Sequence, residues 1–96
     1  MKARFRIGDS FVITGRGLAL LGEILEGTLR RGDELTFHLN DKTYHLVITG
    51  IDMGVRRVGE KGNPFVGLLV RADEQETVEL DRNVLLRGTI AGVASA

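Results

Sequence analysis

Residues 9–35 have the sequence DSFVITGRGLALLGEILEGTLRRGDEL, in which short apolar segments alternate with turns that contain glycine. Gly15-Arg16-Gly17 ends the first apolar segment, and Arg31-Gly32-Asp33 follows the second. Short segments separated by such turns are typical of β-strands rather than of helices. Residues 18–24 are mostly apolar on both faces. This favours a central strand with both faces covered, or a strand whose outer face meets a partner.

The segment at residues 34–49 has the pattern of a β-hairpin. Apolar and polar residues alternate on both sides of Asn40-Asp41, a pair that is typical of a tight turn. The alternation predicts six core side chains, those of Leu35, Phe37, Leu39, Tyr44, Leu46 and Ile48. His38 and His45 fall on the two paired strands and become diagonal neighbours if both face outward.

The remaining apolar segments complete an all-β fold. Residues 65–70 are predicted to form a buried strand and residues 84–89 the closing strand, with at most one short helix, near residues 73–77. We therefore predict a closed antiparallel β-barrel of about six to seven strands. The barrel is expected to occupy residues 1–90 as a single domain, and residues 91–96 are expected to be a frayed tail.

Composition narrows the class of protein. The 96 residues include no cysteine, which excludes a disulfide framework and a cysteine zinc site and makes a cytoplasmic location the default expectation. No apolar run approaches the ~20 residues needed to span a bilayer, and residues 1–10 lack the apolar core of a signal peptide, so no membrane partner is expected. Thirteen Lys and Arg balance thirteen Asp and Glu, so nucleic-acid binding is not the first expectation.

Residues 9–35 resemble the opening strands of the β-barrel that follows the GTPase domain in translation factors. The resemblance resumes at VITGIDM (residues 47–53), FVGLLVR (residues 65–71) and VLLRG (residues 84–88), in the order and at roughly the spacings of the second domain of elongation factor Tu. It covers nearly the whole chain. The resemblance therefore implies the barrel of that domain, without the GTPase domain.

The resemblance also implies roles for particular positions. In elongation factor Tu this barrel helps to hold the aminoacylated end of transfer RNA, and in related factors it contacts the ribosome or the GTPase domain. Asp9 and Phe11 match positions that border the aminoacyl pocket, and Arg16 matches the arginine between the two glycines. Leu21 and Phe65 stand where the family has polar residues. These changes convert a polar docking surface into an apolar one.

Few residues suggest catalysis or a cofactor. The chain has no GxxxxGK[ST] phosphate loop, so we expect no GTP binding by this chain. Two histidines, His38 and His45, fall short of the three or four ligands of a stable zinc site. No serine or threonine lies in a nucleophile motif. We expect no enzyme activity, no metal and no cofactor.

Two functions remain open at the level of sequence. The first is a non-catalytic interaction module that docks a protein partner, or a second copy of itself, through an apolar barrel face; its candidate residues are Phe11, Leu18, Leu21 and Phe65. The alternative is a module that binds RNA or the ribosome through an arginine-rich face; its candidate residues are Arg16, Arg30, Arg31, Arg56, Arg57 and Lys61.

Overall fold

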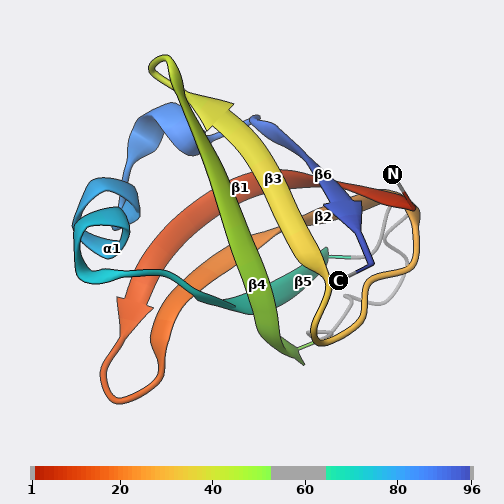
Figure 1. The fold of residues 1–96 in the computed structure, drawn as a ribbon, viewed down its shortest axis with the longest axis horizontal. Coiled ribbons are helices and arrows are strands. Elements are labelled where there is room, and N and C mark those ends of the chain that lie inside the picture. Colours follow the sequence, from red (N-terminus) through yellow and green to blue (C-terminus); the bar gives the residue numbers. More distant parts are fainter. Residues whose placement is uncertain (1, 53–64, 96) are drawn as a thin grey trace, which may run out of the picture.

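The computed structural model describes residues 2–52 and 65–95, and in these residues six strands close into an antiparallel barrel (Figure 1). The order of the strands around the barrel is β1-β2-β5-β4-β3-β6. The strands are β1 (Ala3–Ile13), β2 (Gly17–Gly27), β3 (Glu34–Leu39), β4 (Lys42–Asp52), β5 (Phe65–Arg71) and β6 (Ile90–Ala94). The helix α1 (Glu74–Leu80) and the 3-10 helix η1 (Val84–Leu86) lie between β5 and β6. The predicted fold class is confirmed.

The barrel interior is filled by alternate side chains from every strand. Five of the six predicted hairpin core residues are buried, and Leu39 is partly buried against them. The largest fully buried side chains are Phe5, Ile7, Leu18, Leu20, Leu35, Phe37, Leu46, Ile48, Val66, Leu68, Leu80 and Leu86. Burial of each such side chain contributes about 1.5–3 kcal/mol, so this interior is the main stabilising term.

An irregularity at Gly8 reverses the two faces of β1. Ile7 pairs with Gly22, whereas Asp9 pairs with the adjacent Leu21, so β1 contains one residue more than β2 at this point. Such a bulge shifts the alternation of the strand by one residue. Consequently Ser10 is buried in the barrel, while Phe11 faces outward.

The β3–β4 hairpin matches its sequence pattern. Asn40 and Asp41 have φ angles of 50° and 64°, which are the left-handed conformations that a two-residue hairpin turn requires. His38 pairs with Thr43, and His45 with Thr36, so the two exposed histidines are diagonal neighbours as predicted. Each imidazole Nδ1 lies within hydrogen-bonding distance of a threonine Oγ1, at 2.8 Å for Thr43 and 3.0 Å for Thr36.

The predictions of a closing strand at residues 84–89 and of a frayed tail at residues 91–94 are wrong. Residues 84–86 form η1 rather than part of a closing strand, because the Asn83 side chain accepts a hydrogen bond from the Leu85 N–H and starts a helical turn. The closing strand is β6, which pairs with both β1 and β3. Ala91 and Val93 alternate into the core and are fully buried. The barrel therefore extends through Ala94, and these residues are not a frayed tail.

The predicted short helix is present and extends further than expected. Asp73 accepts a hydrogen bond from the Glu76 N–H, and the Glu76 side chain accepts one from the Asp73 N–H, which is a capping box. Leu80 at the end of α1 is fully buried in the barrel core. In Figure 1, α1 lies on the side of the barrel away from the two chain termini.

An ion pair fastens the N-terminal end to the turn before β3. Lys2 Nζ lies 2.7 Å from Asp33 Oδ2, which also accepts a hydrogen bond of 2.8 Å from the Arg30 N–H. Burial alone would raise the pKa of Asp33, but the bonds from Lys2 and Arg30 outweigh it and hold this pKa below its ordinary value.

In the described residues, no helix has the length and apolar character needed to cross a membrane.

Substitution of Gly22 by alanine tests the close contact between β1 and β2. A Cβ at Gly22 would lie 2.0 Å from the Arg6 carbonyl oxygen and 2.9 Å from Phe5 Cζ, so the strands would have to separate. We expect the free energy of unfolding to fall by more than about 2 kcal/mol, measured by urea denaturation.

The matched control is Gly8→Ala. The nearest atom to its Cβ would be the Leu21 carbonyl oxygen, at 3.4 Å, which is an ordinary contact. We expect a change within about 0.5 kcal/mol. Equal stabilities of the two variants would contradict the close-contact explanation.

Candidate functional site

An apolar groove crosses four neighbouring strands on the outer face of the barrel. Pairing of these strands aligns one row of residues, Phe11, Ala19, Leu69 and Gly50, and a second row, Asp9, Leu21, Gly67 and Asp52. Residues paired across antiparallel strands share a face, so both rows face away from the core. The groove has a volume of about 350 Å³ and is lined by Phe11, Ile13, Arg16, Ala19, Leu21, Gly50, Ile51, Asp52, Gly67, Leu68 and Leu69.

Two glycines keep this groove open. A Cβ at Gly67 would lie 3.1 Å from Leu21 Cδ2, and a Cβ at Gly50 would lie 3.2 Å from Leu69 Cδ1. Each leucine side chain thus lies across a glycine of the neighbouring strand. The floor of the groove is therefore shallow and apolar, because the leucine side chains lie along the surface of the sheet. Neighbouring side chains cover Ala19, which is only 4% exposed.

The predicted protein-binding residues are divided by the structure. Phe11 and Leu21 line the groove together. Leu18 does not belong to it, because Leu18 faces inward and is 1% exposed, so its assignment to a docking surface is wrong. The backbone of Phe65 pairs with Glu23 in β2, and its side chain lies outside what the structure describes.

The three predicted RNA-binding residues that the structure describes do not form one cluster. Arg16 lies in the turn before β2 and lines the groove, whereas Arg30 and Arg31 follow the other end of that 11-residue strand. Arg31 Nε donates a hydrogen bond of 3.1 Å to the Thr49 carbonyl oxygen. The other three predicted residues, Arg56, Arg57 and Lys61, lie outside the described residues.

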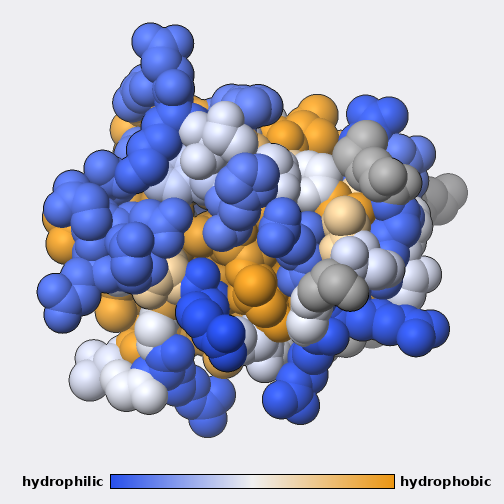
Figure 2. Space-filling view, viewed as in Figure 1, coloured by the Kyte–Doolittle hydropathy of each residue, from blue (hydrophilic) through white to orange (hydrophobic). Residues whose placement is uncertain are grey.

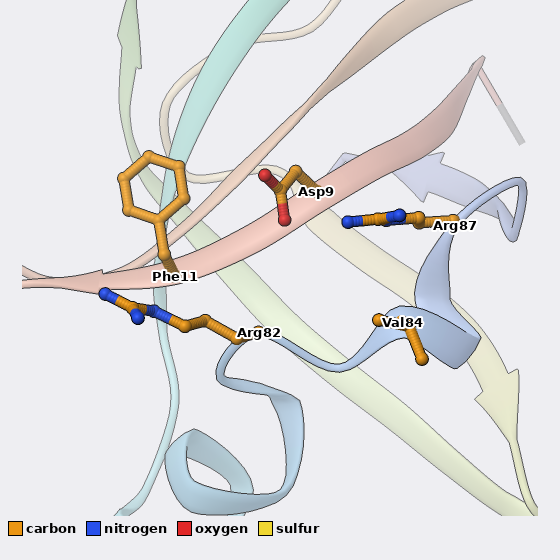
Figure 3. A pocket seen from close by; sticks show the side chains of 5 residues that line it. All are labelled: Asp9, Phe11, Arg82, Val84 and Arg87. Atoms are coloured by element: carbon orange, nitrogen blue, oxygen red, sulfur yellow. The ribbon is translucent and has the colours of Figure 1, made fainter.

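A second, charged pocket adjoins the groove at Phe11. It has a volume of about 350 Å³ and is lined by Asp9, Phe11, Arg82, Val84 and Arg87. Figure 3 shows that Asp9 and Phe11 come from β1, whereas the two arginines come from the chain that follows α1 and approach β1 from the same side. Phe11 is the wall common to the groove and the pocket.

Hydrogen bonds to β1 position the two arginines. The Arg82 N–H donates to the Ser10 carbonyl oxygen at 2.8 Å, and the Gly88 N–H donates to the Ile7 carbonyl oxygen at 2.8 Å. The buried Ser10 hydroxyl donates to the Leu80 carbonyl oxygen. This chain is therefore fixed along an edge of β1. The sequence analysis missed Arg82 and Arg87, and no spacing or motif around them indicates that they reach β1.

A cluster of side chains fastens α1 to the hairpin. Glu79 Oε1 lies 2.7 Å from Lys42 Nζ and accepts a hydrogen bond of 2.9 Å from the Tyr44 hydroxyl. The hydrogen bonds from Lys42, Tyr44 and Gln75 lower the pKa of Glu79 from its ordinary value of 4.5 to about 2. Because α1 leads directly into the arginine-bearing chain, this cluster also supports the charged pocket.

Seen from the side of β3 and β4, the molecule has a hydrophobic area surrounded by hydrophilic side chains (Figure 2).

Within residues 2–52 and 65–95, no group of three or more His, Cys, Asp or Glu side chains could hold a metal ion. No model of a known protein family matches the chain. The functional assignment consequently depends on the groove, the charged pocket and the resemblance described above.

The pH dependence of stability tests the anchor at Glu79. Because the folded-state pKa of Glu79 is lowered to about 2, its carboxylate stabilises the fold fully above pH 4.5, and this contribution is lost as the pH falls from 4.5 towards 2. We expect the stability of the Glu79→Gln variant to fall less steeply over this range than that of the wild type, measured by urea denaturation at several pH values.

Glu74→Gln is the control for this measurement. Glu74 is exposed and lies in the first turn of α1. It is not one of the residues that form the cluster with Lys42 and Tyr44. Its variant is expected to follow the wild-type pH dependence. Parallel curves for the wild type and Glu79→Gln would show that the Glu79 cluster does not stabilise the fold.

Proposed function

We propose that this barrel is a non-catalytic interaction module that docks a protein partner through the outer apolar groove. The observation that carries the proposal is the outward-facing row of Phe11, Ala19 and Leu69, continued by Leu21 in the next row. Apolar side chains on the outer face of a closed barrel gain nothing from the core. Phe11, Leu21 and Leu69 are partly exposed and gain free energy when a partner removes them from water, whereas Ala19 is already covered.

The groove has the composition of an interface centre. Aliphatic and aromatic side chains form its floor and walls, and charged residues lie at its margins, as in protein interfaces with an apolar centre and a polar rim. Each 100 Å² of apolar surface that a partner covers contributes about 2.5 kcal/mol before the costs of association. Strand pairing fixes the backbone beneath every described groove residue except Arg16, which keeps the ordering cost of binding low.

The resemblance to the second domain of elongation factor Tu supports a role in binding rather than in catalysis. In translation factors the corresponding barrel acts through contacts, and the chain bears no phosphate loop. The alternative of RNA or ribosome binding receives less support, because Arg16 and the Arg30-Arg31 pair flank opposite ends of β2. Phosphate contacts weaken steeply with added salt, whereas apolar docking does not, so salt dependence separates the two functions.

The proposal is tested by an acidic substitution in the groove. Tagged wild-type protein, Leu21→Asp and Leu69→Asp are used to capture partners at low and high salt, and each captured partner is then purified and titrated. We expect at least a tenfold loss of affinity for both variants, because an aspartate in a covered apolar site loses its hydration without gaining a partner. Leu69→Asp is informative on its own, since its paired neighbours are Ala19 and Gly50 and include no acid.

Val78→Asp is the matched control. Val78 is an apolar residue on α1 with 74% exposure, and it does not line the groove. Its variant is expected to bind like the wild type. Unchanged affinity of the folded groove variants would contradict the proposal, as would a captured component that is only RNA and is lost at high salt. Sedimentation of the wild type and Leu21→Asp identifies the case in which the partner is a second copy of the chain.

A further inference from the structure

Three arginines around Phe11 have no ion-pair partner in the described part of the chain. Four other cations do have one: Lys2, Arg4, Arg6 and Lys42 each lie within 4 Å of a carboxylate. Arg16, Arg82 and Arg87 are exposed and lie within 4 Å of no carboxylate of residues 2–52 and 65–95. Arg16 lines the groove, and Arg82 and Arg87 line the adjoining pocket.

Three aspartates lie near these arginines, but the described lining of the charged pocket still has an excess of positive charge. Among the described residues, Asp9 is the only acid that lines the charged pocket, and its carboxylate accepts a hydrogen bond of 2.8 Å from the Ser10 N–H. Asp81 precedes the two arginines, and its carboxylate accepts a bond of 3.1 Å from the Val12 N–H. Asp52 lies on the β4 side of the groove, three strands away from β1. The pocket-lining residues that the structure describes thus carry two positive charges and one negative charge.

The groove and the pocket are close enough to hold one short segment of chain. Ala19 and Leu69 lie one and two strands from Phe11, which corresponds to about 5 and 10 Å. The pocket lies on the other side of Phe11. If the pocket lies up to about one strand spacing, about 5 Å, beyond Phe11, a side chain over Ala19 or Leu69 is about 5–15 Å from a side chain in the pocket. An extended peptide advances about 3.3 Å per residue, so the two side chains would be about two to four residues apart.

We propose that the docked partner segment is an extended peptide with an aliphatic or aromatic side chain in the groove and an aspartate or glutamate two to four residues away, held by Arg82 and Arg87. This inference rests on the proposed function and adds the chemical class of the partner. Guanidinium groups bind carboxylates with paired, charge-assisted hydrogen bonds. The floor favours an aliphatic side chain over a nucleobase, because Phe11 is the one aromatic side chain that lines either site in the described residues.

The test begins with selection of random dodecapeptides, displayed without a free C-terminus, on the wild-type barrel. An enriched peptide is then synthesised with an amidated C-terminus, together with a version in which its acid is replaced by the amide. We expect enriched peptides to carry the apolar and acidic pair at the stated spacing. The amide version and the Arg82→Glu and Arg87→Glu variants should each weaken binding about tenfold.

Two further variants separate local from general electrostatics. Arg30→Glu reverses a positive charge in the same way, but at the other end of β2. It should leave the affinity for the peptide unchanged. Asp9→Asn removes the acid from the pocket while keeping an oxygen for the Ser10 N–H, and it should strengthen binding of the acidic peptide severalfold.

The outcomes distinguish this inference from the proposed function. One outcome is that the enriched peptides are apolar and contain no acid, and that Leu21→Asp abolishes their binding while Arg82→Glu does not. This outcome would overturn the inference and leave the proposed function standing. Failure to enrich any peptide would overturn the inference alone, because the partner in the proposed function can also be a folded protein surface. Binding that Leu21→Asp leaves unchanged would overturn both. Tighter binding of a single-stranded RNA dodecamer than of any peptide, lost in Arg82→Glu, would overturn the inference in favour of RNA.

Discussion

The β-bulge at Gly8 controls which side chains of β1 face the core. Before the bulge Phe5 and Ile7 fill the barrel, and after it Ser10 occupies the inward position while Phe11 faces outward. Without the bulge, regular alternation of the same residues from Ile7 onward would bury Phe11 and expose Ser10. The groove exists because this one irregularity turns a large aromatic side chain towards the outer leucines of β2 and β5.

The same irregularity places the charged pocket. Because Ser10 faces inward, its hydroxyl accepts a hydrogen bond from the Asn83 N–H and donates one to the Leu80 carbonyl oxygen. Those bonds fasten the end of α1 and the chain after it to β1, with further bonds at Arg82 and Gly88. A buried hydroxyl must be satisfied within the protein, so this connection is strongly specified. The position of Arg82 and Arg87 is thus a consequence of the register of β1.

The sequence predicted the barrel and its hairpin because those features depend on local patterns. Alternation around Asn40-Asp41 is sufficient to place the β3–β4 core residues. The assignment of Leu18 to the outer face failed for a different reason. Residues 18–24 are apolar on both faces, so only the register with β1 determines that Leu18 faces inward and Leu21 outward.

Residues 84–86 resemble a strand in composition, but the Asn83 cap and the burial of Leu86 favour a helical turn. Arg82 and Arg87 carried no local signal, since tertiary hydrogen bonds alone bring them to Phe11.

In the proposed mode of docking, the groove and the charged pocket contribute different properties to binding. The apolar groove supplies affinity for many aliphatic side chains, but contact with a flat apolar floor distinguishes poorly between partners or between directions of a bound chain. The pocket has two arginines and the groove has one, Arg16, so the orientation that brings the acidic side chain to Arg82 and Arg87 is favoured. Asp9 then limits how many segments are accepted, since a second negative charge in the pocket weakens every acidic ligand. A partner must offer both the apolar side chain and the carboxylate, at a spacing that the fixed strands of the barrel determine.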